Sequence, residues 1–263
     1  MTPRVSDRIL IKLGGTLLDQ DDSRLRLAQE IATAASDGSR HIVVVHGGGK
    51  QMTRFLAERG VESRFVNGLR VSSPEVIDAV VKVFAGSVNA SLVTAFRAAG
   101  ARPVGLSGLD AGLVDAEILN PELGQVGRPV ASDPRLLELL TREHYLPVVA
   151  CVAGDAAGRV YNVNADQMAV SCAISFQASK LIFLTDVEGV RDGAGQIRPV
   201  LTIAGAKDLI RGGVATGGMQ AKLESCIEAL EKGVREVLIA PGATSGIVET
   251  ALKQSGIGTR LIP

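Results

Sequence analysis

Short apolar, β-branched runs alternate along the chain with segments in which apolar residues recur at helical spacing. Runs of the first kind are typical of buried strands, and segments of the second kind are typical of helices that cover a sheet. We expect strands at 8–13, 41–45, 102–106, 145–152, 180–190 and 235–240. This alternation predicts βαβ units, and therefore an α/β fold with a mostly parallel sheet.

The helical pattern is clearest in five segments. In the segment from 49 to 60, Met52, Phe55 and Leu56 face inward and Gly60 ends the helix. The segment at 164–176 is apolar nearly all round, which indicates a helix covered on most sides. We expect helices at 23–36, from 49 to 60, from 74 to about 100 with an interruption near Gly86, at 164–176 and at 217–233.

The glycine-rich passage in the middle of the chain has a different pattern. Segments 112–118 and 124–130 are expected to be short strands of a hairpin or flap. The βα pattern restarts after residue 176, so the chain is divided into lobes 1–176 and 177–263. No low-complexity linker separates them, and we expect both lobes to share one continuous sheet.

Composition narrows the classes of function. Lys plus Arg equals Asp plus Glu at 28 each, so no overall field favours nucleic acid or anionic lipid, and aromatic residues make up only 3%. The three cysteines and three histidines show no metal-ligand spacing, so no metal site made by protein side chains is expected. The beginning of the chain lacks a signal-peptide pattern and no apolar run reaches membrane-spanning length, so we expect a cytoplasmic protein without a membrane contact.

The sequence HGGG at 46–49 follows a predicted strand, and two kinds of site can use it. In esterases such a loop builds an oxyanion hole, but that chemistry needs a GxSxG elbow, and around Ser107 the second position after the serine is Leu109. A Walker A loop and a GxGxxG motif are also absent. Two possibilities remain: the backbone amides of the loop approach an anion, or the glycines only permit a tight turn from strand to helix.

A second glycine loop, KLGG at 12–15, follows the first predicted strand. Parallel strands end at one edge of a sheet, so both loops are expected where α/β proteins bind ligands, with Lys12 beside them. Lys222 lies early in a predicted helix, where a bound anion would offset the unfavourable interaction of the lysine with the helix dipole, although a solvated surface lysine is the more common case. Asp166 suits the first turn of its helix, and the residues alone do not separate that role from the alignment of two lysines.

Six motifs occur in a fixed order: KLGG, HGGG, NGLRV, YNVNAD, LTDVEGV and GGMQAK. With them the chain resembles the amino acid kinase family over nearly its whole length, and within that family the members that phosphorylate the γ-carboxylate of N-acetyl-L-glutamate in arginine biosynthesis. The resemblance implies a three-layer αβα sandwich around a mainly parallel sheet of about eight strands. It also implies that lobe 1–176 binds the amino-acid substrate and forms a homodimer, and that lobe 177–263 binds ATP.

The same resemblance implies a role for each residue that matches a motif. Lys12 and Lys222 would stabilise the transferred phosphoryl group, and Asp166 would position both. Gly47 and Gly48 would face the substrate and the reacting centre, whereas Arg70 and Asn162 would hold the α-carboxylate end of the substrate. The ATP site, with Mg²⁺ carried by the nucleotide, would be lined by Gly14, Gly15, Asp186, Val187, Glu188, Gly189, Val190, Arg191, Val214, Ala215, Thr216, Gly218 and Met219.

A carboxylate acceptor is already ionised at neutral pH, because its pKa is about 4.3, so this reaction needs no catalytic base. Alternatives remain open at this point. One is a kinase for an α-aminoadipate derivative of lysine biosynthesis, since one methylene changes binding by only about 1–3 kcal/mol. The other is a non-catalytic nucleotide or amino-acid sensor. Arginine-inhibited members have an extra N-terminal helix, and the few residues before the first strand here predict an unregulated homodimer.

Overall fold

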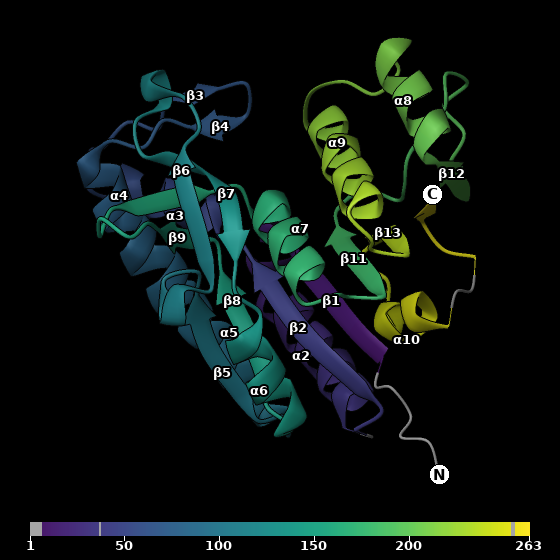
Figure 1. The fold of residues 1–263 in the computed structure, drawn as a ribbon, viewed down its shortest axis with the longest axis horizontal. Helices are drawn as coiled ribbons and strands as arrows, with labels where there is room; N and C mark the ends of the chain where they lie inside the picture. Colours follow the sequence, from purple (N-terminus) through teal and green to yellow (C-terminus); the bar gives the residue numbers. More distant parts are fainter. Residues whose placement is uncertain (1–6, 37, 254–255) are drawn as a thin grey trace.

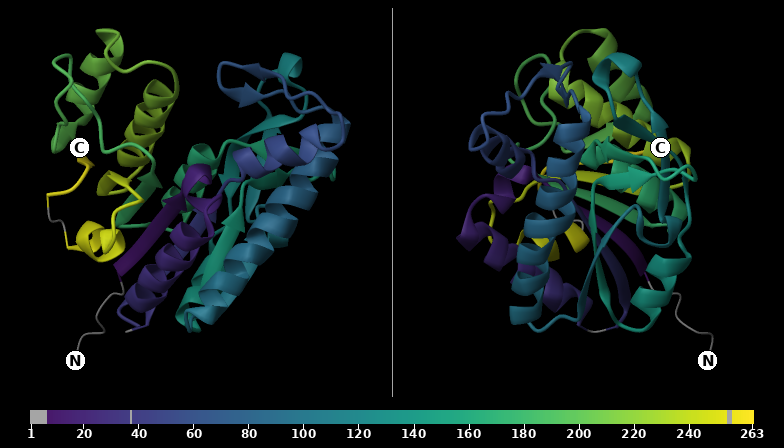
Figure 2. Two further views of the ribbon diagram at one scale, coloured as in Figure 1. Left: turned by 180° about the vertical axis from the view of Figure 1, so that it is seen from behind. Right: turned by 90° about the vertical axis from the view of Figure 1, so that its left-hand side faces the viewer.

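The computed structural model describes residues 7–36, 38–253 and 256–263. A sheet crosses the molecule between two helical layers (Figure 1), with α6 (Arg135–Arg142) and α7 (Ala165–Ser175) on one face. Seen from behind (Figure 2, left), α2 (Asp21–Ala35) and α5 (Asn89–Ala98) cover the other face. The three-layer αβα prediction is thus confirmed. The expectation about the chain before the first strand falls on residues 1–6, outside the described part.

The central sheet has eight strands in the order β12-β14-β13-β11-β1-β2-β8-β5. Every neighbouring pair is parallel except β13 and β14, so the prediction of a mainly parallel sheet of about eight strands is confirmed. The strands are β1 Asp7–Leu13, β2 Arg40–His46, β5 Pro103–Ser107, β8 Leu146–Ala150, β11 Lys180–Thr185, β12 Val200–Thr202, β13 Glu236–Pro241 and β14 Thr259–Ile262. Because β11 pairs with β1, one sheet runs through both parts of the chain.

The register of the sheet brings three strand ends together. Lys12 on β1 pairs with Val45 of β2 on one side and with Phe183 of β11 on the other. The amide of Gly14 donates to the carbonyl of Leu184 at 2.8 Å, which extends the ladder past the end of β1. The two glycine loops and the segment after β11 therefore begin at one edge of the sheet, as the sequence predicts.

The remaining helices lie on the same two layers or at the top of the molecule. The predicted helices 23–36, 49–60, 164–176 and 217–233 are all present, with boundaries shifted by a few residues at most. The predicted helices include α3 Gly49–Ala57, α4 Pro74–Val80 and α9 Gly217–Glu231, and the helices that were not predicted are α1 Gly15–Leu18, α8 Ile203–Arg211 and α10 Ile247–Leu252. Short 3₁₀ turns occupy Asp110–Gly112 and Pro121–Leu123.

The region predicted as a helix interrupted at Gly86 is in fact one continuous helix from Pro74 to Ala98. Its middle, Val81–Val88, is wound as a π-helix, so Gly86 lies inside a wider turn and does not end the helix. At 25 residues this helix is long and apolar enough to cross a membrane, which corrects the expectation that no apolar stretch reaches that length. Half of its most apolar 18-residue stretch is buried, and Phe84 and Phe96 pack into the core of the protein.

The glycine-rich passage folds into a small second sheet above β8. The predicted hairpin is confirmed, since β6 (Val114–Ile118) pairs antiparallel with β7 (Val126–Ser132). Two further strands, β9 (Val152–Gly154) and β10 (Val160–Val163), close these into a barrel. A short hairpin of β3 (Phe65–Val66) and β4 (Leu69–Arg70) extends from the same end of the molecule (Figure 1).

Candidate active site

A cavity of about 1030 Å³ opens at the carboxyl edge of the central sheet. Its walls come from the loop after β1, the N-terminus of α7, the loop after β11 and the first turns of α9, and the β3–β4 turn also contributes. The predicted residues that line it are Lys12, Gly14, Gly15, Asp166, Asp186, Val187, Gly218, Met219 and Lys222. The cavity thus gathers residues from both predicted lobes.

Asp166 lies at the centre of this group and contacts two lysines. Its Oδ1 is 2.7 Å from Nζ of Lys12, and its Oδ2 is 2.5 Å from Nζ of Lys222. Asp166 is placed by the start of α7, where the Asn164 side chain accepts from the Asp166 and Gln167 amides at 2.8 and 3.3 Å. The ammonium group of Lys222 also lies 5.0 Å from the centre of the Phe183 ring.

The electrostatics of Asp166 follow from this arrangement. Burial by itself would raise the pKa of the carboxyl, but the adjacent charges of Lys12 and Lys222 outweigh burial and lower it to about 2. Asp166 is therefore ionised throughout the physiological range. Two cations share one anion, so the group has an excess positive charge that faces the cavity and can stabilise an anionic ligand.

The two glycine loops meet beside these lysines. A Cβ atom on Gly15 would lie 3.5 Å from the amide nitrogen of Gly49, so the two backbones are close neighbours. Gly47 and Gly48 are buried, and a Cβ on Gly47 would lie 3.3 Å from that of Ala165, next to Asp166. Neither Gly47 nor Gly48 is among the residues that line the cavity, so their contact with the substrate stays a prediction.

The predicted nucleotide segment 186–191 is divided by the structure. Asp186 lies in the cavity, where its two oxygens accept from the hydroxyls of Thr16 and Thr185, both at 3.1 Å. Although partial burial opposes it, these hydrogen bonds lower the pKa of Asp186. Gly189 and Val190 are buried, and the Val190 amide donates to Thr259 at 2.7 Å.

The other predicted nucleotide residues lie at the margin of the cavity. Glu188 and Arg191 are exposed and outside its lining. Val214, Ala215 and Thr216 immediately precede α9 and also lie outside the lining, with Val214 exposed and Ala215 buried. Their assignment to an ATP site stays a prediction.

Arg70 is the last residue of β4, and Asn162 lies on β10. The Arg70 guanidinium is buried, stacks 4.6 Å from the Phe65 ring centre, and donates to Ser63, to Thr53 Oγ1 at 2.8 Å and to the Gly49 carbonyl at 3.2 Å. Among the described residues these hydrogen-bond partners are all uncharged, so the arginine charge is available to a ligand carboxylate. Asn162 connects to Arg70 through Ser72, which donates to the Arg70 carbonyl and accepts from Asn162.

Several cavity residues were not singled out from the sequence. Asn67 and Gly68 form the tip of the β3–β4 hairpin over the cavity, both with positive φ, at 49° and 78°. The Asn-Gly dipeptide between short apolar runs is a signal for such a turn and could have identified it. Thr16 and Gly217 also line the cavity; no pattern in the sequence marks Thr16, whereas Gly217 begins the GGMQAK motif.

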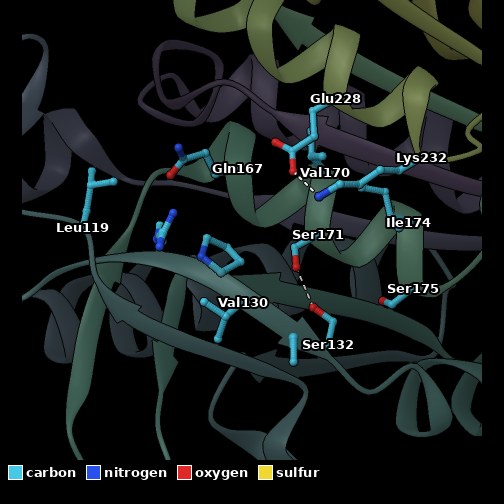
Figure 3. A pocket seen from close by; sticks show the side chains of 13 residues that line it. Leu119, Val130, Ser132, Gln167, Val170, Ser171, Ile174, Ser175, Glu228 and Lys232 are labelled. Atoms are coloured by element: carbon cyan, nitrogen blue, oxygen red, sulfur yellow. Dashed lines mark hydrogen bonds and ion pairs between the residues drawn. The ribbon is translucent and has the colours of Figure 1, made fainter.

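A second cavity of about 600 Å³ lies between β7, α7 and α9 (Figure 3). In it Lys232 contacts Glu228 at 2.7 Å, and the hydroxyls of Ser132 and Ser171 are 2.6 Å apart. Glu228 and Gln167 line both cavities. The ionised groups of this second cavity are therefore already paired.

The esterase alternative finds no support at Ser107. This serine is buried, and its hydroxyl donates to Asp110 at 2.8 Å. Among the described residues, no group of three His, Cys, Asp or Glu side chains forms a metal-binding cluster. The cavity instead combines two lysines, the carboxylate of Asp166 between them and the neighbouring glycine loops, which defines an α/β enzyme that stabilises the negative charge of a transferred group.

Comparison with known proteins identifies the family. The model of the amino acid kinase family matches residues 7–241, and the chain belongs to this family. A relative from Solibacter usitatus named acetylglutamate kinase is 59% identical over 97% of this chain and 99% of its own. Another of the same name, from Mesorhizobium japonicum, is 40% identical over 97% of this chain and 90% of its own.

A solved structure supports the fold independently. The N-acetylglutamate synthase of Neisseria gonorrhoeae, complexed with coenzyme A and N-acetyl-glutamate, matches with a TM-score of 0.86 at 24% identity. The match covers 98% of this chain and 60% of that one. At this identity the likeness concerns the fold alone.

Proposed function

We propose that this enzyme transfers the γ-phosphoryl group of ATP to the γ-carboxylate of N-acetyl-L-glutamate, which gives N-acetyl-L-glutamyl 5-phosphate and ADP for arginine biosynthesis. The observation that carries the proposal is the Lys12–Asp166–Lys222 cluster in the main cavity. The substrate is supported by the relative that is 59% identical and named acetylglutamate kinase.

In this reaction a carboxylate oxygen of the substrate forms a bond to the γ-phosphorus while the bond to the bridging oxygen of ADP breaks. No proton is transferred, which agrees with a site in which His46 is fully buried and hydrogen-bonded. The protein has little covalent chemistry to perform, so catalysis consists of alignment and charge stabilisation. Lys12 would neutralise charge on the transferred group, and Lys222 would neutralise it on the side of the leaving ADP.

Asp166 would not act as a base, because its carboxylate is held ionised by the two lysines. Its role is to fix the directions of both ammonium groups before the substrates arrive. Such preorganisation avoids the cost of reorienting charged groups during the reaction. The amides of the two glycine loops would add donors to the phosphoryl oxygens, with Gly14 and Gly15 on the nucleotide side and Gly47 and Gly48 on the acceptor side.

The proposal includes Mg²⁺ that enters bound to ATP. Such a metal usually keeps several waters and is held by one or two carboxylates together with substrate phosphates. Asp186 fits this need, since its carboxylate lies in the cavity and is oriented by the Thr16 and Thr185 hydroxyls. When bound, the metal would neutralise charge on the β- and γ-phosphates, and Asp186 would contact its hydration shell.

The substrate-binding parts of the proposal divide between the lobes. Arg70 and Asn162, in lobe 1–176, would bind the α-carboxylate end of N-acetyl-L-glutamate, because a guanidinium can donate two parallel hydrogen bonds to a carboxylate. Lobe 177–263 would bind ATP along 186–191 and the segment 214–219. We further infer a homodimer in the cytoplasm. Light scattering of the purified protein tests the homodimer.

An ATP- and magnesium-dependent assay that traps acyl phosphate as a hydroxamate tests the function. N-acetyl-L-glutamate, glutamate and N-acetylaminoadipate should be offered in parallel, and a signal with N-acetyl-L-glutamate alone is expected. Preference for the aminoadipate compound would instead place the enzyme in lysine biosynthesis. No signal with any acceptor, despite ATP binding, would refute the proposed reaction.

A further inference from the structure

His46, the first residue of HGGG, forms a buried pair with Asn89 that no role above uses. His46 is the last residue of β2 and is fully buried. Its Nδ1 lies 2.8 Å from the carbonyl oxygen of Gly47, and its Nε2 lies 3.0 Å from Nδ2 of Asn89. Asn89 is also buried and is the first residue of α5. The long helix on the far face of the sheet therefore contacts the glycine loop through a histidine.

The partners of Asn89 determine the tautomer of His46. Nδ2 of Asn89 also lies 2.8 Å from the carbonyl oxygen of Val148 and 3.4 Å from that of Leu106. Carbonyl oxygens only accept hydrogen bonds, so the Asn89 amide presents its NH₂ group to this site. Nε2 of His46 must then accept, and the ring proton resides on Nδ1, which donates to Gly47.

The ring remains neutral under ordinary conditions. Burial lowers the pKa of His46 to about 4, although the hydrogen bond with the Gly47 backbone opposes part of this change. The Asn89 NH₂ group also disfavours a second ring proton, because it already occupies Nε2 as a donor. His46 is thus a fixed hydrogen-bond donor to the loop and takes no part in proton transfer.

This bond fixes the peptide plane between Gly47 and Gly48. In a trans peptide the C=O and the following N–H point in opposite directions, and the described residues contain no cis peptide. With the Gly47 carbonyl held toward the His46 ring, the Gly48 N–H points away from the far-face helix. The other face of the loop is the one that approaches Ala165 at the start of α7, next to Asp166.

The π-helical segment supports the same loop from below. A Cβ on Gly48 would lie 2.8 Å from Cδ1 of Phe84 and 3.2 Å from Cγ2 of Val88. Both residues belong to the π-helix, and Asn89 follows it directly. A π-turn contains more residues than an α-turn, so it rotates every later side chain of the helix relative to an all-α path. The wider turns thus let Phe84, Val88 and Asn89 all face the loop.

We propose that His46, held in its Nδ1–H form by Asn89, is a positioning residue that aims the Gly48 amide at the carboxylate and phosphoryl group of the reaction. This inference rests on the proposed function for the identity of the reacting groups. His46 touches neither substrate and acts through the Gly47 peptide. Its removal should therefore reduce kcat, while ATP, bound on the opposite side of the site, should keep its KM.

A matched pair of variants tests this role. The side-chain N–H of asparagine can replace Nδ1–H of His46, whereas the longer glutamine places its amide nearer to Nε2. In the hydroxamate assay, H46N should keep most of the wild-type kcat, and H46Q should lose kcat on the order of 10²-fold with the KM for ATP unchanged. Equal kcat values for two folded variants, whether both high or both low, would overturn the proposal, because packing alone does not distinguish the two amides.

The tautomer gives a second test that requires no substrate and no variant. Nitrogen-15 NMR of the imidazole in the wild-type protein distinguishes a protonated Nδ1 from a protonated Nε2. We expect the Nδ1–H form for His46 at neutral pH, and an Nε2–H form or an imidazolium would overturn the inference even if a variant failed to fold. If the wild type shows the Nδ1–H form but phosphorylates no acceptor, the proposed function fails and the hydrogen-bond arrangement stands.

Discussion

Lys222 and Asp166 come from helices on either side of the predicted lobe boundary, and their charged atoms lie 2.5 Å apart. Both side chains are largely buried, with exposed fractions of 12% and 16%. This contact connects the first turns of α9 and α7, and Lys12 completes it from β1. The two lysines are therefore held at a fixed separation before any ligand binds, as a charge-stabilising site requires.

Replacement of Lys222 by alanine should mainly lower kcat, on the order of 10²- to 10³-fold, because a preorganised charge at the reacting group is removed. Asp166 keeps its contact with Lys12, so the fold should survive, as circular dichroism would show. Lys232→Ala is the matched control, since Lys232 caps the same helix and pairs with Glu228 at 2.7 Å in an exposed position. Full turnover by Lys222→Ala in the hydroxamate assay would refute the assigned role.

Replacement of Arg70 by alanine should mainly raise the KM for N-acetyl-L-glutamate. Loss of a hydrogen bond to a charged group costs about 1.5–3 kcal/mol, which corresponds to roughly a 10- to 100-fold change. Arg64→Ala on the same segment is the control, because that side chain is exposed. An unchanged KM together with a lower Tm would show that Arg70 stabilises the fold through its hydrogen bonds to Thr53 and Ser63 and does not bind substrate.

The glycine loop should tolerate a methyl group at one position and reject it at the next. A Cβ on Gly48 would lie 2.8 Å from Phe84, whereas a Cβ on Gly49 would meet nothing within 4 Å. Gly48→Ala should therefore destabilise the protein by about 1–3 kcal/mol through overpacking, and Gly49→Ala much less. Urea unfolding measures both. A truncation of Phe84 in the Gly48→Ala background should recover part of the lost stability. If no stability is recovered, the packing argument is contradicted.

Stability should depend on pH through His46. Burial depresses its folded pKa to about 4 from 6.5, so the unfolded chain binds this proton more readily. The contribution of His46 is complete above pH 6.5 and is lost as the pH falls toward 4, by about 3 kcal/mol. When the free energy of unfolding is plotted against pH, the His46→Asn variant should lack this part of the slope. Identical slopes for the two proteins would show that His46 is not the group that titrates.

The strands of the central sheet were predictable because parallel strands buried on both faces are continuous apolar runs. Strands at 8–13 and 41–45 were therefore identified almost to the residue, whereas the strand predicted at 180–190 ends at Thr185. The last strand, Thr259–Ile262, was missed, because four half-buried residues have no distinctive period and depend on pairing with β13. Tertiary contact decided that element.

The site was predictable where its residues belong to the six motifs and not where they lie outside them. Lys12, Asp166 and Lys222 belong to motifs whose order identifies the family, and the structure brings them together. Thr16 and Asn89 stand in ordinary sequence, and only the folded arrangement shows their partners. The π-helix was equally hidden: Gly86 suggested a break because glycine disfavours a helix, whereas packing of Phe84 and Val88 against the loop keeps the helix continuous.

The sheet that joins both lobes has a consequence for refolding. Lys12 is on the first strand, Asp166 follows the small barrel, and Lys222 lies on a helix next to β13. A segment that contains all three charges must therefore extend from β1 to α9. An intermediate with only one lobe formed would leave Asp166 without Lys222. Recovery of turnover after dilution from denaturant should therefore coincide with the slowest conformational phase. Enzyme activity then reports directly when the native topology is complete.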